Sequence, residues 1–499
     1  MDTRQLLLAI DLGTSGVKVG AFESDGRLVA KRRRAYPAMS PRPEWMEQDP
    51  ETWWAACRQA IKEVVRATPA DRYHGIAVTG LAPALVCLDE HGRPVRPAPI
   101  WSDRRAVAEI TELTERLGYD TNFSLLPRLQ WLRRHESEEY RRTRWVCQSF
   151  EYLSFKLTGE VVSIAPTDQL RPWSERDIEV AELDLDKFPS RMCKLGERLG
   201  ALSLDVAADL ELPAGLPVIA GTVDTFAAWL GTGTTEKGIL CNTVGTSDGI
   251  ALVWDEPVSD PAGPVYAMPH ITGRGWIIGG ALSSGGLLLD WFARRFYSHL
   301  TRPFAEIEKE ARSVPAGAEG VIILPYLVGE RWPLFDPHAR GVFFGLAESH
   351  TRAHLARAVL ESVAFAIRHV CEAIETTGAR IEDVRIAGRA AHNEVWSQIK
   401  ADVLGQPVLI PEIADSGLLG AAIIAGWGVG WFSDLAQATT SMVRFRARLE
   451  PDAERHEVYT RIFALYRDLY AHLKQDFLRL FNLNASCLRQ RKWRPEPGQ

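Results

Sequence analysis

The sequence has little cysteine, no long apolar run and no excess of basic charge. Its 499 residues carry a formal net charge of −6 at pH 7. This charge argues against nucleic-acid and anionic-membrane partners, because proteins that bind them usually present a basic face. No apolar run approaches the roughly 18 residues of a membrane-spanning helix, and the run near the start is too short for a signal peptide. We therefore expect a cytoplasmic protein without nucleic-acid or membrane partners.

Cysteine is scarce and scattered. The seven cysteines lie far apart and form no Cys-x-x-Cys pair, a pattern that fits neither a disulfide framework nor a zinc site. We expect reduced cysteines in the core. With 46% hydrophobic and 24% charged residues, the composition is that of a globular chain of roughly two to four domains.

Residues 6–22 predict a strand, a tight turn and a second strand. An apolar run leads to Asp11, small polar residues follow, and apolar side chains then alternate with the period of a strand. The Walker A loop and the dinucleotide fingerprint both lead from a strand into a helix, so neither fits. The amides and hydroxyls of Gly13, Thr14 and Ser15 can face an anion, and Asp11 is placed to hold a magnesium ion. A plain β-hairpin is the alternative.

The same pattern returns near the middle of the chain. Residues 239–253 again combine an apolar strand, a turn with Gly245, Thr246 and Ser247, and an alternating strand. A repeat at this distance indicates duplicated domains that face one cleft. It strengthens the interpretation of both turns as phosphate-binding loops.

A single carboxylate follows the predicted strand in the stretch 216–231. Asp224 stands where this strand leads into a helix, so it can be an N-cap residue, the common role of an aspartate there. In a protein with two phosphate turns, a carboxylate at a strand-to-helix turn is also a candidate base for a substrate hydroxyl group. Both interpretations stay open at this point.

Two loops of the first half carry aromatic and charged side chains. Trp45 and its neighbours precede a helix that Asp49 should cap and Pro50 should begin. They suit either surface packing or the apolar side of a sugar ring. Trp101 and Asp103 follow a predicted strand, at the kind of edge where α/β sheets bind ligands. The alternative for Asp103 is a helix N-cap.

Further candidate positions lie in the second half. Gly388 and Asn393 stand at a helix entrance, which suits a nucleoside or a plain helix-entry turn. Glu361 shares one face of a long helix with Arg357, a pairing that we interpret as structural. The residues beyond Ser486 are expected to form a basic, solvated tail.

Together these segments resemble the FGGY carbohydrate kinases, the family that contains xylulokinases, gluconate kinases and glycerol kinases. The resemblance runs from about residue 6 to residue 475 and rests on three motifs that occur in the family's order. They are Trp-Met-Glu-Gln-Asp-Pro at 45–50, Leu-Pro-Tyr-Leu-Val-Gly-Glu-Arg at 324–331 with the stretch 336–346, and Trp396 with Gln398, Asp402 and Gly405.

The resemblance implies an α/β fold of two ribonuclease-H-like domains, as in the actin and sugar kinase superfamily, with an active-site cleft between the domains. The expected division is an N-terminal sugar-binding domain at 1–236, a C-terminal ATP-binding domain at 237–485 and a basic tail at 486–499. ATP and Mg²⁺ are the implied cofactors, and a small carbohydrate is the implied partner. A homodimer is one implied assembly, because members of the family are often dimers.

The motifs and the resemblance together assign roles to individual residues. Asp224 is the implied catalytic base, and Lys18 stands near the transferred phosphoryl group, where glycerol kinases have an arginine. The other implied site residues are Asp11 and Asp224 for the metal, Gly13, Thr14, Ser15, Gly245 and Thr246 for the ATP phosphates, Gly388 and Asn393 for adenosine, and Ala82, Pro83, Trp101, Asp103, Asp224 and Thr225 for the sugar.

Departures from the family leave the substrate open. Xylulokinases carry Met-His where this chain has Ala82 and Pro83, and typically Asn where it has Thr225. Ala387 and Arg389 flank Gly388 where the family usually has glycine, so the approach to the adenine base is expected to differ. A five-carbon ketose such as xylulose, or a sugar alcohol, is the expected substrate, and a sugar acid such as gluconate is the alternative.

Two rival functions share the phosphate hairpins. An actin-like or chaperone-type ATPase also has duplicated hairpins, but the motif at 45–50 and the Gly-Glu-Arg segment argue against it. A catalytically silent relative that binds sugar or regulates is the second rival, and the retained Asp11, Asp224 and glycine turns argue against that. We therefore predict an active, ATP-dependent carbohydrate kinase.

Overall fold

The computed structural model describes residues 5–245, 247–258, 265–388 and 393–491. Contacts within the chain divide it into two units. Unit 1 comprises Met1–Thr235, Ile271–Arg274 and Asp415–Arg444, and unit 2 comprises Glu236–His270, Gly275–Ala414 and Phe445–Gln499. Unit 1 therefore includes a late segment of the sequence, which a linear division into 1–236 and 237–485 would leave in the second domain.

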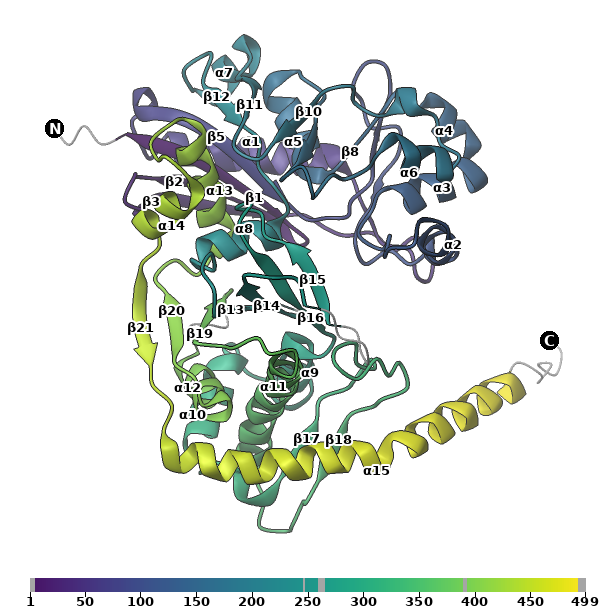
Figure 1. The fold of residues 1–499 in the computed structure, drawn as a ribbon, viewed down its shortest axis with the longest axis vertical. Coiled ribbons are helices and arrows are strands. Elements are labelled where there is room, and N and C mark those ends of the chain that lie inside the picture. Colours follow the sequence, from purple (N-terminus) through teal and green to yellow (C-terminus); the bar gives the residue numbers. More distant parts are fainter. Residues whose placement is uncertain (1–4, 246, 259–264, 389–392, 492–499) are drawn as a thin grey trace. The chain divides into compact units, whose positions relative to one another are not determined.

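Unit 1 is built on a six-stranded mixed sheet with the strand order β11-β12-β5-β1-β2-β3 (Figure 1). Its strands are β1 (Leu6–Gly13), β2 (Gly16–Phe22), β3 (Leu28–Ala35), β5 (Tyr73–Gly80), β11 (Arg198–Ala201) and β12 (Pro217–Ile219). The first three are antiparallel neighbours, β5 and β12 run parallel to β1, and β11 is an antiparallel edge strand. The predicted hairpin is confirmed, with Gly13 opposite Gly16.

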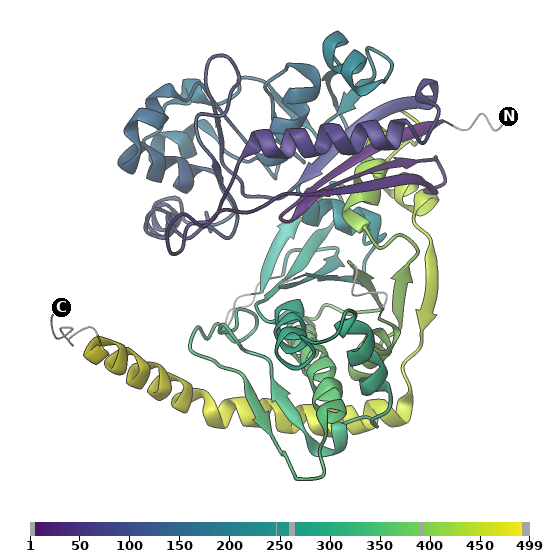
Figure 2. The ribbon, with the colours of Figure 1, turned by 180° about the vertical axis from the view of Figure 1, so that it is seen from behind.

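Helices α1 (Pro50–Val65) and α13 (Ser416–Gly428) cover opposite faces of this sheet. Leu6 and Leu8 belong to the same core cluster as Trp53 of α1, and Figure 2 shows α1 in front of the strands. Leu7 points the other way, because alternate residues of a strand face opposite sides; it lies 3.2 Å from where a Cβ on Gly426 of α13 would be. As predicted, Asp49 caps α1 and Pro50 begins it.

Helix α8 (Asp224–Gly231) packs directly on α13. A Cβ on Gly420 would lie 1.9 Å from the carbonyl oxygen of Ala227, so only glycine permits this approach. The remaining elements of unit 1 are β4 (Glu47–Gln48), β6 (Val86–Leu88), β7 (Ala98–Pro99), α2 (Val107–Leu117), α3 (Leu126–His135), α4 (Ser137–Arg142), β8 (Trp145–Cys147), α5 (Ser149–Thr158), β9 (Ser163–Ala165), α6 (Glu175–Val180), β10 (Met192–Lys194), α7 (Leu204–Leu210) and α14 (Leu435–Met442), with short 3₁₀ turns at Ala70–Arg72 and Leu185–Lys187.

Unit 2 is built on a seven-stranded sheet with the order β15-β16-β14-β13-β19-β20-β21. Its strands are β13 (Ile239–Val244), β14 (Asp248–Trp254), β15 (Tyr266–Pro269), β16 (Trp276–Leu282), β19 (Asp383–Ala387), β20 (Val408–Pro411) and β21 (Phe445–Leu449). Apart from β15, three antiparallel strands, two parallel strands and an antiparallel edge strand repeat the order of unit 1. The repeated topology confirms the predicted α/β fold with duplicated domains.

The helices of unit 2 surround a core centred on α11. They are α9 (Gly285–Phe296), α10 (Pro303–Arg312), α11 (Arg352–Glu375), α12 (Glu394–Leu404) and α15 (Ala453–Arg491), and a hairpin of β17 (Ile322–Leu324) and β18 (Val342–Phe344) with a 3₁₀ turn at Ala318–Gly320 completes the unit. Glu361 and Arg357 form a buried ion pair at 2.7 Å, as predicted.

The C-terminal helix is longer than the sequence predicts. Tyr459, Tyr466 and Tyr470 are buried. The C-terminal half of α15 projects beyond the other elements of unit 2 (Figure 1). Within the expected basic tail at 486–499, residues 486–491 continue the helix. Strong helix formers such as Leu, Arg and Gln explain this continuation. Residues 492–499 lie outside the described residues.

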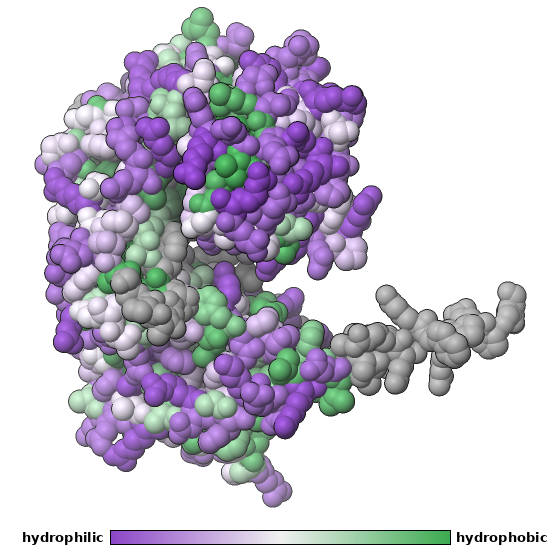
Figure 3. Space-filling model, turned by 45° about the vertical axis from the view of Figure 1, so that its right-hand side comes forward, coloured by the Kyte–Doolittle hydropathy of each residue, from purple (hydrophilic) through white to green (hydrophobic). Residues whose placement is uncertain are grey.

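The face of the molecule drawn in Figure 3 is mainly hydrophilic. On the face shown in Figure 3, apolar side chains form only small, separate patches. Among the described residues, no helix is long and apolar enough to cross a membrane. The six cysteines whose side chains are described are free and buried, as predicted.

Candidate active site

In unit 1, the turn between β1 and β2 is held in place by the motif at 45–50. Gln48 donates from Nε2 to the carbonyl oxygen of Thr14 at 2.6 Å. Its own Oε1 accepts a hydrogen bond from the indole of Trp53 at 2.9 Å. Trp101, which is 42% exposed, donates from its indole to the hydroxyl of Thr14 at 3.0 Å. The two loops with aromatic side chains therefore both reach the predicted phosphate turn.

Two further side chains fix the same turn from β3 and the residue that follows it. Arg33 donates to the carbonyl oxygen of Ser15 at 3.1 Å and to its hydroxyl at 3.0 Å. The hydroxyl of Tyr36 donates to the carbonyl oxygen of Gly13. These bonds hold the turn by its carbonyl oxygens and by the Ser15 hydroxyl.

Lys18 on β2 lies between two carboxylates. Its Nζ donates to Asp11 Oδ2 at 2.9 Å and is 3.2 Å from Asp415 Oδ1. Asp415 also accepts from Lys31 at 2.8 Å. Burial alone would lower the pKa of Lys18, but the charges of Asp11 and Asp415 outweigh it and raise the pKa above its ordinary value. Lys18 is therefore a permanent cation beside Asp11.

Asp415 is a site residue that the sequence analysis missed. It precedes the first residue of α13, and burial would raise its pKa, but Lys18 and Lys31 hold the pKa below its usual value. The α13 N-terminus lies against Asp11, because a Cβ on Gly417 would be 3.3 Å from both carboxylate oxygens. A helix N-terminus favours a nearby anion. An acidic residue directly before a run of small helical residues was the available signal.

Asp224 is the first residue of α8 and not its N-cap, which is Val223. Its Oδ1 accepts from the backbone amide of Thr225 at 2.7 Å and from the Thr225 hydroxyl at 3.3 Å. The side chain is half-buried. Burial, followed by the charge of Asp11, raises the pKa of Asp224 to about 7, although Thr225 and Lys18 act in the opposite direction. Asp224 can therefore take up a proton near neutral pH.

Asp103 connects the loop that contains Met46 to the loop that follows β7. Its Oδ2 accepts from the backbone amide of Met46 at 2.6 Å, and Arg105 donates to both of its oxygens, at 2.8 and 2.7 Å. The side chain is only 2% exposed. The alternative of a helix N-cap does not hold, because α2 begins at Val107 after Ala106. Buried Arg105 also lies 2.7 Å from Glu47 and 3.7 Å from the ring centroid of Trp45.

Ala82 and Pro83 join through a cis peptide bond. Pro83 is buried and Ala82 is partly buried against the core of unit 1. The next amide, that of Ala84, donates to Gln148 Oε1 at 3.0 Å. Ala82 and Pro83 thus lie in a defined turn, and their contact with a sugar stays a prediction.

In unit 2, the residues predicted to bind the nucleotide lie at the ends of β13 and β19 and at the start of α12. Gly245 follows β13, and its carbonyl oxygen accepts from the amide of Gly286 at 3.0 Å. Gly388 follows β19 with a φ of 92°, a conformation that favours glycine. Asn393 caps α12 by accepting from the amide of Trp396 at 2.8 Å. Thr246 and Arg389 lie outside the described residues.

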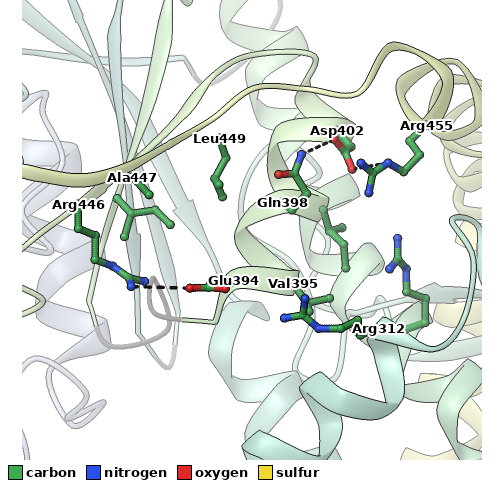
Figure 4. Close-up of a pocket in the computed structure, with 12 residues that line it drawn as sticks. Arg312, Glu394, Val395, Gln398, Asp402, Arg446, Ala447, Leu449 and Arg455 are labelled. Atoms are coloured by element: carbon green, nitrogen blue, oxygen red, sulfur yellow. Dashed lines mark hydrogen bonds and ion pairs between the residues drawn. The ribbon is translucent and has the colours of Figure 1, made fainter.

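A cavity of about 300 Å³ lies in unit 2 beside α12, β20 and β21 (Figure 4). It is lined by Arg312, Arg357, Glu394, Val395, Gln398, Ile399, Asp402, Ile410, Arg446, Ala447, Leu449 and Arg455. Each of its four arginines lies within 4.0 Å of a carboxylate. Because these charges are already matched within the protein, we assign no anion site there.

Known proteins match nearly the whole chain. Residues 6–231 match the FGGY family of carbohydrate kinases, N-terminal domain, and residues 240–429 match the C-terminal domain. A xylulose kinase of Escherichia coli (strain K12) is 32% identical over 485 residues, covering 94% of this chain and 99% of that protein. A gluconokinase of Bacillus subtilis (strain 168) is 27% identical over 501 residues, covering 95% and 97%. The crystal structure of xylulose kinase from Rhodospirillum rubrum has a TM-score of 0.81 at 31% identity, covering 95% of this chain and 100% of that one. The chain therefore belongs to the FGGY family of carbohydrate kinases.

Proposed function

We propose that this carbohydrate kinase transfers the γ-phosphoryl group of ATP to a hydroxyl group of a five-carbon ketose such as xylulose, or of a sugar alcohol. The observation that carries the proposal is Asp224, a half-buried carboxylate that Thr225 holds by one oxygen and whose pKa is about 7. A general base works best with a pKa near the operating pH. The similarity to the E. coli xylulose kinase supports the ketose.

In the proposed reaction, Asp224 accepts the proton of the substrate hydroxyl group. Phosphoryl transfer passes through a loose transition state, so the protein mainly positions the reactants and neutralises charge. Lys18, kept cationic by two carboxylates, suits the second task. The amides of Gly13, Thr14 and Ser15 are the proposed donors to the ATP phosphates.

The nucleotide residues of unit 2 are part of the same proposal. Gly245 and Thr246 are assigned to the ATP phosphates, and Gly388 and Asn393 to adenosine. The side-chain oxygen of Asn393 accepts the hydrogen bond that caps α12. We therefore propose that its side-chain nitrogen donates to the nucleoside.

Mg²⁺ is proposed at Asp11 and Asp224. Mg²⁺ typically takes one or two carboxylates and completes its shell with substrate phosphates and water. Over the described ranges, no cluster of three or more His, Cys, Asp or Glu side chains forms a complete protein cage, and a pair of carboxylates fits this pattern. Thr225 occupies one oxygen of Asp224, which leaves the other for the cation or the substrate. Bound there, the ion would neutralise phosphate charge.

The residues that we assign to the sugar have different proposed roles. Trp101, exposed and bonded to Thr14, can present its face to the apolar side of a sugar ring. Asp103 would act through the loop that it holds, since its oxygens are taken by Met46 and Arg105. A homodimer and a cytoplasmic location are further parts of the proposal.

Gluconate, a sugar acid, is the second candidate substrate. The similarity to the B. subtilis gluconokinase supports it. Xylulokinases also carry other residues at the positions of Ala82, Pro83 and Thr225. These three positions therefore give no support to a ketose substrate.

The test is a screen of ADP release with Mg²⁺ and ATP over ketoses, polyols and sugar acids. We expect turnover above background with one of these classes, and a loss of roughly 10²–10⁴-fold in Asp224→Ala, the range for removal of a general base. The matched control is Asp468→Ala, which removes an exposed aspartate of α15. If no sugar raises turnover, or if Asp224→Ala keeps wild-type turnover, the proposed reaction or its base is wrong.

A further inference from the structure

A polar triad lies inside the hydrophobic core of unit 2. Lys400 of α12 is 2% exposed, and Asn242 of β13 and Asp248 of β14 are fully buried. Lys400 Nζ donates to Asn242 Oδ1 at 2.6 Å, and Asn242 Nδ2 donates to Asp248 Oδ2 at 3.1 Å. The amide of Asn242 therefore connects a buried cation to a buried anion. Burying such charges is costly unless they are paired and hydrogen-bonded.

The triad stands directly beside the glycine turn of unit 2. Asp248 is the register partner of Val244, and these two residues close the turn that contains Gly245. A Cβ on Gly285 would lie 1.9 Å from Asp248 Oδ1, so the carboxylate presses against the first turn of α9. The amide of Gly286 in that turn donates to the carbonyl oxygen of Gly245. Asp248 thus contacts both segments that meet at the turn.

The charges of the triad depend on each other. Burial raises the pKa of Asp248, and Lys400, Asn242 and the amides of Gly286 and Gly245 act against this rise. Burial lowers the pKa of Lys400 to about 8, and Asp248 is the charged group that counteracts it. Each charge therefore offsets part of the effect of burial on the pKa of the other.

Stability does not explain the triad well. Replacing a buried ion pair by apolar residues of similar volume is often neutral or stabilising. In some proteins a buried polar or charged group instead fixes one arrangement of the chain, as a single buried polar residue does in a coiled coil. The arrangement fixed here is that of the Gly245 turn and the α9 N-terminus.

We infer that Lys400 and Asp248 are positioning residues for the ATP phosphates, acting through Asn242 on the Gly245 turn and the first turn of α9. This inference rests on the proposed function, because it assumes that the Gly245 turn binds the nucleotide. Neither side chain needs to contact the nucleotide. Their effect is to keep the backbone of Gly245 and the first turn of α9 in one orientation, with a buried positive charge behind them.

The test measures ADP affinity by titration calorimetry, together with the KM values for ATP and the sugar and the melting temperature. Lys400→Met should weaken ADP binding and raise the KM for ATP about tenfold, while the KM for the sugar stays unchanged. Lys309→Met makes the same chemical change on the surface of α10, where Lys309 is 76% exposed, and should bind as the wild type does. Adding Asp248→Asn to Lys400→Met should recover part of the affinity, because the uncompensated carboxylate is removed.

A second measurement follows the pH dependence of ADP binding. ADP affinity of the wild type should fall between about pH 7 and pH 9, as Lys400 loses its proton around its pKa of about 8, and this fall should be absent in Lys400→Met. A flat profile in the wild type, or equal losses of ADP and sugar affinity together with a lower melting temperature in Lys400→Met, would overturn the inference. If the wild type itself binds no ADP, the proposed function fails instead.

Discussion

At the residue scale, opposing influences act on Asp224. As the first residue of α8 it lies at a helix N-terminus, where the helix dipole favours the charged carboxylate, and Thr225 donates two hydrogen bonds to the same oxygen. Burial and the charge of Asp11 act more strongly in the other direction and bring the pKa to about 7. A carboxylate with this pKa is ionised often enough to act as a base and still basic enough to hold the proton it accepts.

This balance predicts the pH dependence of the reaction. Below the Asp224 pKa of about 7, the protonated carboxyl group cannot accept the substrate proton, so kcat/KM should fall about tenfold per pH unit and level off above pH 7. Thr225→Val removes a hydrogen bond that lowers this pKa, so its acid limb should move to higher pH. Thr225→Ser keeps a hydroxyl group and serves as the control. A profile that is flat through pH 6, or an acid limb that moves down in Thr225→Val, would contradict the role of Asp224.

At the scale of elements, the first turn of α13 lies beside the candidate site residues of β1 and β2. Asp415, just before this helix, shares Lys18 with Asp11 and holds Lys31 as well. Gly417 allows the helix N-terminus to approach Asp11. A helix from the last quarter of the sequence therefore borders the turn that we propose for the ATP phosphates.

The ion pairs of Lys18 with Asp11 and Asp415 predict a clear effect of Asp415→Asn. Lys18 loses one of its two carboxylate partners and is held by Asp11 alone, so the position of Lys18, which we propose to lie near the transferred phosphoryl group, is less defined. Hydrogen bonds to charged groups contribute about 1.5–3 kcal/mol, and we expect kcat to fall roughly 10- to 100-fold with a smaller change in the KM for the sugar. Lys31→Met, which removes the other partner of Asp415, should keep most activity. Wild-type kcat in Asp415→Asn would show that Lys18 needs only Asp11.

The elements themselves were largely predictable because their signals are local. The period-two alternation after Asp11 predicts β2, and Asp49 with Pro50 predicts the start of α1. The long-range partners were not predictable, since Lys400 and Asn242 are 158 residues apart and no spacing rule connects them. Asp103 shows the same limit: its motif suits a ligand contact, but its oxygens are taken by Met46 and Arg105, which only the folded loops reveal.

At the scale of the whole molecule, the two units repeat one topology, but the chain does not pass through them once each. The segment Asp415–Arg444 belongs to unit 1, although it follows most of unit 2 in the sequence. That segment supplies α13, which covers one face of the sheet of unit 1 with fully buried side chains such as Leu418, Ile423 and Ile424. Two domains cut at one point in the sequence would leave this face bare.

The late return of α13 predicts how fragments of unit 1 behave. Four buried Leu and Ile side chains of α13 contribute roughly 6–12 kcal/mol, at roughly 1.5–3 kcal/mol each, which is comparable to the total stability of about 5–15 kcal/mol of a typical domain. A fragment of residues 1–235 should therefore aggregate or show no cooperative thermal unfolding. Joining residues 415–444 to it through a short Gly-Ser linker should restore a cooperative transition, because Gly231 lies beside Ser416 and the linker has little distance to span. Cooperative unfolding of the fragment without α13 would show instead that the sheet of unit 1 is stable with one face uncovered.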